Sequence, residues 1–173
     1  GMGGDKSLHI GGDLSTQTDF IVTVSFGGQY VGATDVSFKI FDIDEGNDHD
    51  RIINNYATAA NGLTSVAPTI SDLGSTVQLT GSGLGQVLTG YGASPDAGVD
   101  SANGNATISF GSTSIQSFTF DFKNTSGPPR FQDIGLFDLN FTPVPEMNPA
   151  WLAGLSCLAA GFLILRHNAR VRK

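Results

Sequence analysis

Residues 18–26, TDFIVTVSF, alternate between large apolar side chains and smaller or more polar ones. Successive side chains of an extended strand point to opposite faces. One face of this segment would therefore carry Phe20, Val22, Val24 and Phe26. Such alternation indicates a strand that buries one face and exposes the other. The following Gly27-Gly28 pair indicates a turn.

The same alternation recurs along the chain. A second strand is expected at residues 35–42, with Val36, Phe38 and Ile40 on its apolar face. Further strands are expected at 50–56, 76–80, 85–89, 105–110, 115–122 and 134–142. In the last two, the predicted apolar faces are Phe118, Phe120 and Phe122, and Phe137, Leu139 and Phe141.

Short strands separated by clusters of Gly, Asn, Ser and Pro predict an all-β fold. We expect an antiparallel β-sandwich or jelly roll. Before residue 149, no long stretch has helical periodicity. Residues 57–104 contain few large apolar residues and many turn formers, so short edge strands and long loops are expected there.

The charge of the chain is unevenly distributed. Of nine Lys and Arg residues, four lie at the C-terminus, so the first 165 residues carry five cations against 16 acids, a formal charge of 5 − 16 = −11. This argues against a nucleic-acid partner, because nucleic-acid binding needs a basic surface. The single cysteine, Cys157, excludes an intrachain disulfide and a cysteine-based metal cluster.

The C-terminal segment has the features of a membrane anchor. Residues 150–165 contain no charge and predict a transmembrane-type helix, although sixteen residues are near the short limit for a bilayer core of about 30 Å. Trp151 suits the membrane interface, and the positive-inside rule places the basic end in the cytoplasm. The flanking cations are Arg166, Arg170, Arg172 and Lys173. A buried C-terminal helix of a soluble domain and a plain anchor remain alternatives.

The layout of this segment resembles the PEP-CTERM sorting signal. The matching residues are Val144, Pro145 and Glu146, followed by the apolar helix and the basic cluster. The second proline of the family motif would fall at Met147, so the motif departs there. The resemblance implies export and processing by an exosortase, a membrane-embedded cysteine transpeptidase. The strand-rich body, with VSFKIFDID and ANGNATISF, also resembles the β-rich ectodomains often attached to such tails.

These features divide the chain into five parts. Gly1 before Met2 indicates a remnant of an expression tag, and an upstream leader is expected for an exported protein. The parts are a leading segment (1–17), a β-sandwich ectodomain (18–142), a Pro-rich linker with the sorting motif (143–149), the apolar helix (150–165) and a basic cytoplasmic tail (166–173).

The densest acidic stretch, FDIDEGNDHD at residues 41–50, suggests a calcium site. Ca²⁺ takes about six to eight oxygen ligands. The EF-hand pattern fails, because Gly46 and Ile53 occupy the fifth and twelfth positions counted from Asp42. A solvated acidic loop that caps a strand remains the alternative. The candidate ligands are Asp42, Asp44, Asp48 and Asp50.

No catalytic centre is recognisable. His9, His49 and His167 lie far apart in the sequence, and a Ser-His-Asp triad lacks parts. His49 is expected to be exposed and structureless, with a role in metal binding beside Asp48 and Asp50 as the alternative. We therefore expect a protein that is not an enzyme.

Tyr56 and Tyr91 could form a sugar-stacking platform, with core or loop packing as the alternative. The expected function is that of an exported structural or adhesive protein, membrane-anchored or in the extracellular matrix. The alternative is a calcium-stabilised carbohydrate-binding module, with extracellular polysaccharide as a partner.

Overall fold

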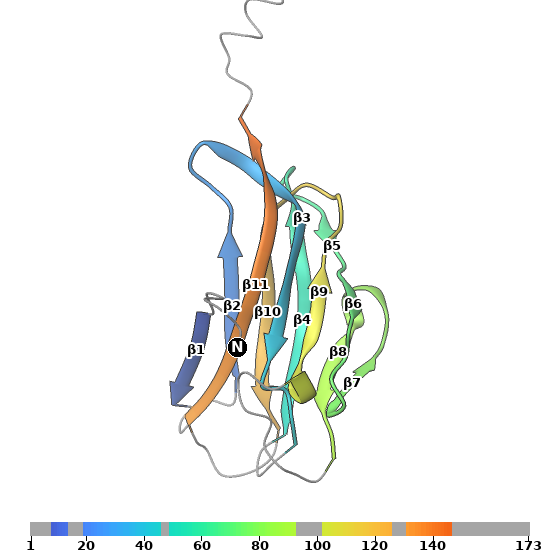
Figure 1. Ribbon diagram of the computed structural model, residues 1–173. Helices are drawn as coiled ribbons and strands as arrows, with labels where there is room; N and C mark the ends of the chain where they lie inside the picture. The colour runs from blue at the N-terminus through green and yellow to red at the C-terminus, as the bar shows by residue number, and fades with distance from the viewer. Residues whose placement is uncertain (1–7, 14–18, 46–48, 93–101, 126–130, 147–173) are drawn as a thin grey trace, which may run out of the picture.

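The computed structural model describes residues 8–13, 19–45, 49–92, 102–125 and 131–146 (Figure 1). These residues form eleven strands and two short 3₁₀ helices, so the all-β prediction is confirmed. The strands are β1 (Leu8–Asp13), β2 (Asp19–Ser25), β3 (Tyr30–Phe41), β4 (Asp50–Ala59), β5 (Ser65–Val66), β6 (Thr69–Ser71), β7 (Val77–Thr80), β8 (Val87–Gly90), β9 (Ala106–Ser109), β10 (Ile115–Asn124) and β11 (Phe131–Pro145). The helices are η1 (Gly83–Gly85) and η2 (Ala102–Gly104).

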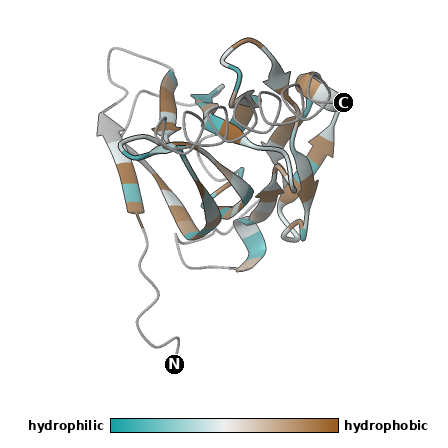
Figure 2. Ribbon diagram, turned by 90° about the horizontal axis from the view of Figure 1, so that it is seen from above, coloured by the Kyte–Doolittle hydropathy of each residue, from teal (hydrophilic) through white to brown (hydrophobic). Residues whose placement is uncertain are grey.

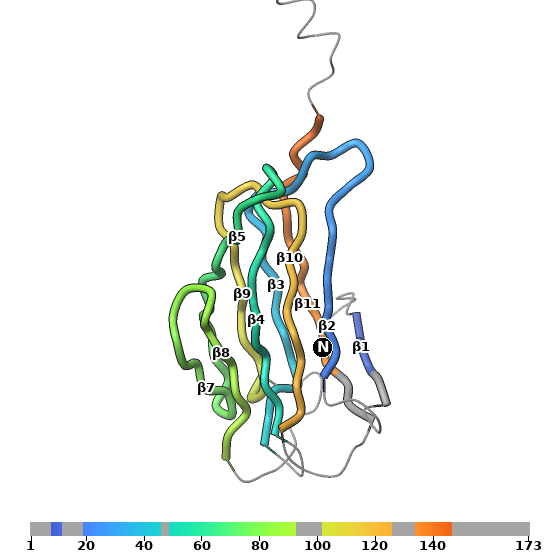
Figure 3. Tube along the Cα trace, turned by 180° about the vertical axis from the view of Figure 1, so that it is seen from behind, coloured from blue at the N-terminus to red at the C-terminus, as the bar shows by residue number. Residues whose placement is uncertain are grey.

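All the strands pair antiparallel in one sheet that divides into two layers. One layer has the order β1-β11-β3-β9-β6, and the other has β2-β10-β4-β8-β7, with β5 also paired to β4. The layers join where β3 meets β10 at a single residue pair, Ala33 and Ile115. Figure 1 shows β11 and β3 in front of β10 and β4, and Figure 3 shows the second layer from behind.

The core lies between the layers. Phe38 of β3 stacks on Phe118 of β10, with ring centroids 4.4 Å apart. The predicted inward faces of β3 and β10 are confirmed, since all six side chains are buried: Val36, Phe38, Ile40, Phe118, Phe120 and Phe122. Figure 2 shows the underlying alternation of hydrophobic and polar residues along the strands.

The strand β2 covers one edge of this core as its pattern predicted. Phe20 stacks on Phe122, with centroids 4.9 Å apart, and Val22 is buried. Ile21, on the opposite face, is 68% exposed. The alternation in residues 18–26 therefore assigned the two faces correctly.

The predicted apolar face of residues 134–142 is confirmed only for Leu139, which packs against the core, whereas Phe141 is 46% exposed. Ile134 and Leu136 also point into the core, and the rings of Phe137 and Phe41 have centroids 4.6 Å apart. The register against β3 shifts after Phe137, where Asp138 has a left-handed φ of 51°. A bulge of this kind adds an unpaired residue and changes which side chains face inward, so Leu139 packs against the core.

Two boundaries also differ from the expected ones. Residues 8–13 of the leading segment form β1, which pairs with β11. Residues 143–145, assigned from sequence to a linker, belong to β11: Pro143, Val144 and Pro145 pair with Ala33, Gly32 and Tyr30. After Leu136, β11 pairs only with β3 among the described residues, so this part of β11 is an edge of the layer. Prolines are tolerated on edge strands.

Candidate functional site

The acidic stretch folds as a hairpin connection between β3 and β4. The Asp50 N–H donates to the Asp44 carbonyl (3.1 Å), and the Asp44 N–H donates to Asp50 Oδ2 (3.4 Å). Asp44 and Asp50 are only 8% and 5% exposed. The alternative of a solvated loop is therefore wrong for these two carboxylates, because they lie inside the connection.

Asp42 marks the turn at the end of β3. Its φ of 72° is left-handed, a conformation that Asp and Asn adopt more readily than most other residues. Among the residues that the structure describes, no group of three or more His, Cys, Asp or Glu side chains is arranged to hold a metal ion. Asp48 lies outside the described residues. Asp42, Asp44 and Asp50 are thus not brought together as a calcium site within the described part of the chain.

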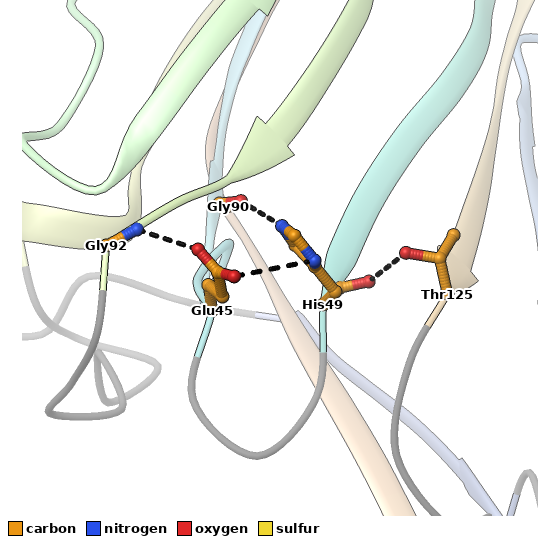
Figure 4. Close-up of polar contacts among 5 residues, drawn as sticks. All are labelled: Glu45, His49, Gly90, Gly92 and Thr125. Atoms are coloured by element: carbon orange, nitrogen blue, oxygen red, sulfur yellow. Dashed lines mark hydrogen bonds and ion pairs between the residues drawn. The ribbon is translucent and has the colours of Figure 1, made fainter.

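Glu45 and His49 clamp this connection to the end of β8 (Figure 4). His49 Nε2 donates to the Gly90 carbonyl (2.9 Å), and its Nδ1 lies 3.7 Å from Glu45 Oε1. Glu45 Oε2 accepts from the Gly92 N–H (2.8 Å). The expectation of an exposed, structureless His49 is wrong, because both ring nitrogens face protein groups and the side chain is 32% exposed.

The backbones of the connection and β8 approach closely at Gly90. A Cβ atom on Gly90 would overlap the carbonyl of Asp44. On the other side of the hairpin, the N–H and the hydroxyl of Thr125 both donate to the His49 carbonyl (3.0 and 3.2 Å). The acidic stretch thus ties the ends of β3, β4, β8 and β10 together.

Tyr56 lies elsewhere, on the outer face of the second layer. Directly opposed residues of antiparallel strands share a face. Tyr56 is opposite Thr119, which is opposite Thr23, and the two threonine hydroxyls hydrogen-bond at 3.0 Å. We call the outward residues of β2, β10 and β4 the outer face: Asp19, Ile21, Thr23, Ser25, Ser117, Thr119, Asp121, Lys123, Arg51, Ile53, Asn54, Tyr56 and Thr58.

An ion-pair network occupies the other end of the outer face. Lys123 Nζ lies 2.9 Å from Asp19 Oδ2 and 3.8 Å from Asp121 Oδ2. The Asp19 hydrogen bond, and then the charge of Asp121, raise the pKa of Lys123 above its ordinary value. Arg51 is directly opposite Lys123, and its positive charge opposes that rise.

A bulge in β4 lies between Tyr56 and this network. Its register against β10 shifts between the pairs Thr119–Tyr56 and Asp121–Ile53. Asn54 has a left-handed φ of 53°, and its amide donates to Asp121 Oδ2 (3.3 Å). The outer face therefore combines an aromatic ring, an amide, hydroxyls and charged groups. Such groups can orient a polar ligand.

Asn54, Asp121, Lys123 and Arg51 were not predicted as site residues. The polar positions between Phe118, Phe120 and Phe122 were a signal for the outward residues of β10. Nothing in the sequence signalled the bulge or the pairing of β10 between β2 and β4. Tyr91 is not part of this face; it follows β8, and its N–H donates to the Thr76 carbonyl (2.9 Å).

The predicted sorting residues lie at the end of β11. Val144 is half-buried, whereas Pro145 and Glu146 are exposed. The Glu146 N–H donates to the Gln29 carbonyl (3.1 Å), in the connection between β2 and β3. The motif therefore begins within the folded sheet.

The predicted membrane elements lie outside the described residues. This holds for the helix at 150–165 and for Trp151, Arg166, Arg170, Arg172 and Lys173. Within the described part of the chain, no helix has the length and apolar character needed to cross a bilayer.

No protein-family model matches the chain. Comparison with curated proteins and with solved structures finds no significant match either.

We predict that Gly90→Ala destabilises the protein by about 1–3 kcal/mol, because the new Cβ would push β8 away from the Asp44 carbonyl. The control is Gly85→Ala, where a Cβ meets open space and no left-handed φ; we expect a change within about 0.5 kcal/mol. Urea unfolding measures both. Equal effects of the two substitutions would contradict the close packing at Gly90.

We predict that the Lys123 network stabilises the fold in a pH-dependent way. Because the folded pKa of Lys123 lies above the unfolded one, its contribution is complete below about pH 10.4 and is lost as the pH rises through the folded pKa. The free energy of unfolding should therefore be lower for Lys123→Met than for the wild type, by an amount that is constant at pH 7–9. The gap should shrink above about pH 10.5. A gap independent of pH throughout would contradict this role.

Proposed function

We propose that the chain is an exported, non-enzymatic surface protein that presents a β-sandwich of jelly-roll type. A PEP-CTERM-like tail would sort it to the membrane and to an exosortase. The role would be structural or adhesive, at the cell surface or in an extracellular polysaccharide matrix. The observation that supports this best is the position of the motif at the end of β11.

The accessibility of the motif supports its recognition by a membrane-embedded enzyme. Pro145 is the last residue of β11, and Glu146 is held by one backbone hydrogen bond to Gln29. Both residues are exposed, so a peptidase would need to release only the last ladder contacts to bind an extended substrate. The residues of β11 that precede the motif pair with β3, and this pairing would keep the body folded during processing.

The charge distribution supports the same orientation. The four cations after residue 165 favour the cytoplasmic side of a membrane. Acidic residues oppose translocation little, and an acidic body would stay dispersed outside the cell through self-repulsion.

We predict that protein isolated from its native cells has been cleaved near Glu146. Its intact mass should correspond to a chain whose C-terminus lies near that residue. Glu146→Ala should instead yield a chain that extends to Lys173, because the backbone bond to Gln29 is kept while the carboxylate is lost. Thr142→Ala, an exposed change in the same strand, is the control and should be processed normally. A wild-type mass that reaches Lys173 would make the tail an ordinary anchor. Normal processing of Glu146→Ala would remove the motif from the mechanism.

The outer face supports a second candidate function, carbohydrate binding. Tyrosine offers a rigid surface with both apolar and polar parts, and a sugar ring can stack on it. The hydroxyl of Thr119 and the amide of Asn54 flank Tyr56 and could bind sugar hydroxyls. Lys123 and the directly opposed Arg51 lie four residues along β10 from the pair of Thr119 and Tyr56. This separation corresponds to about 13 Å along the strand. An extended glycan would suit this surface better than a single small sugar.

We predict that any saturable glycan binding on an array weakens at least tenfold in Tyr56→Ala, a loss of about 1.4 kcal/mol. Tyr56→Phe should retain most of the binding, since the ring remains. Tyr91→Ala is the control, because Tyr91 lies away from the outer face and is 47% exposed. Binding that depends on Tyr91 and not on Tyr56 would assign the sugar platform to the end of β8.

A further inference from the structure

One end of the molecule collects three turns and the end of β11 (Figure 1). The turns are residues 26–29, 60–64 and 110–114. The Phe26 N–H donates to the Gln116 carbonyl (2.8 Å), the Ala60 N–H to the Ser114 carbonyl (2.9 Å), and the Glu146 N–H to the Gln29 carbonyl (3.1 Å). We call this end, made of the three turns and residues 145–146, the tail-exit pole.

The two ends of the molecule differ in charge. None of the three turns of the tail-exit pole contains Asp, Glu, Lys or Arg. At the other end, residues 42–50 alone contain five acidic residues. Glu146 is the acidic residue of the tail-exit pole, and Asp35 lies next to it, since the Asp35 N–H donates to the Gly111 carbonyl. The end from which the tail continues is therefore the end with the lower density of negative charge.

The tail-exit pole also exposes apolar side chains. Leu63 is 90% exposed, the highest value among the exposed large apolar residues of the described chain. It lies in a defined turn, since Asn61 Oδ1 accepts from the N–H groups of Leu63 and Thr64 (3.0 and 3.2 Å). Val31 and Phe141 are also exposed near this end. The rings of Phe141 and Phe26 have centroids 5.2 Å apart.

The length of chain beyond β11 limits how far this end can be from a membrane. Only residues 146–149 separate Pro145 from Ala150, where the predicted helix begins. Fully extended, this segment spans at most about 18 Å. With Trp151 at the interface, the turns would lie close to the lipid headgroups.

We propose that the tail-exit pole rests on the membrane surface, with Leu63 inserted into the interfacial layer. The acidic connection between β3 and β4 then points away from the bilayer. The partner is the lipid surface itself, and the proposal rests on the proposed membrane insertion of the tail. Docking would hold β11 upright at the membrane, so that Pro145 and Glu146 lie within reach of a membrane-embedded enzyme.

The test uses the full chain, reconstituted in vesicles of phosphatidylethanolamine and phosphatidylglycerol. A single cysteine is placed at Leu63→Cys in a Cys157→Ser background and labelled with the polarity-sensitive fluorophore nitrobenzoxadiazole. Two matched controls carry the label at Leu84→Cys, an exposed leucine of η1 that also follows a glycine, and at Tyr91→Cys. Flotation with the vesicles reports tail insertion independently of the label.

The expected result is a blue-shifted, brighter emission from position 63 on vesicle binding, with quenching by lipids that carry a shallow nitroxide. Positions 84 and 91 should keep the emission they have without vesicles. Flotation with an unchanged signal at position 63 would overturn the docking proposal and leave the proposed function intact. Equal changes at all three positions would also overturn it, because the body would then lie on the membrane without preference. A chain that does not float would overturn both proposals.

Discussion

The contact between Phe38 of β3 and Phe118 of β10 is the interaction on which the other parts of the structure depend. Among the described residues, the two layers share one bridging residue pair, so side-chain packing more than backbone pairing holds them face to face. Burial of a phenylalanine contributes about 1.5–3 kcal/mol, and a favourable ring pair adds about 0.5–1.5 kcal/mol. With its phenylalanines turned inward, β10 must direct Thr119, Asp121 and Lys123 outward. The core thus determines which residues form the outer face.

Left-handed residues adapt the strands to this core. The non-glycine residues with positive φ in the described chain are four aspartates and one asparagine: Asp35, Asp42, Asn54, Asp72 and Asp138. In the acidic stretch, Asp42 ends β3 and Asp50 accepts a backbone hydrogen bond. Several carboxylates that resemble metal ligands in the sequence therefore have a conformational role. At the opposite end, the three turns contain no Asp, Glu, Lys or Arg.

Prediction from sequence succeeded where the buried face of a strand follows from the alternation of its own residues. The buried sides of β2, β3 and β10 follow from alternation, because a strand with one buried face must alternate. Prediction failed for the first part of β11, where Ile134 and Leu136 are the inward residues, because alternation carries no signal for the bulge at Asp138. It failed for His49 as well, because the Gly90 carbonyl that binds the ring comes from a strand 41 residues away. Tyr56 could be named as an aromatic candidate, but its neighbours Thr119 and Asn54 could not.

The sequence alone determined the all-β class, the inward faces of three strands, the acidic body and the apolar, basic-ended tail. These properties depend on local periodicity and composition, which a chain carries whatever its partners are. Only the tertiary structure decided that Tyr56 lies with Thr119 and Asn54, that Asp44 and Asp50 are buried, and that the uncharged turns gather where β11 ends. Those arrangements depend on strand pairing between distant segments, and pairing is selected by the packing of the whole core.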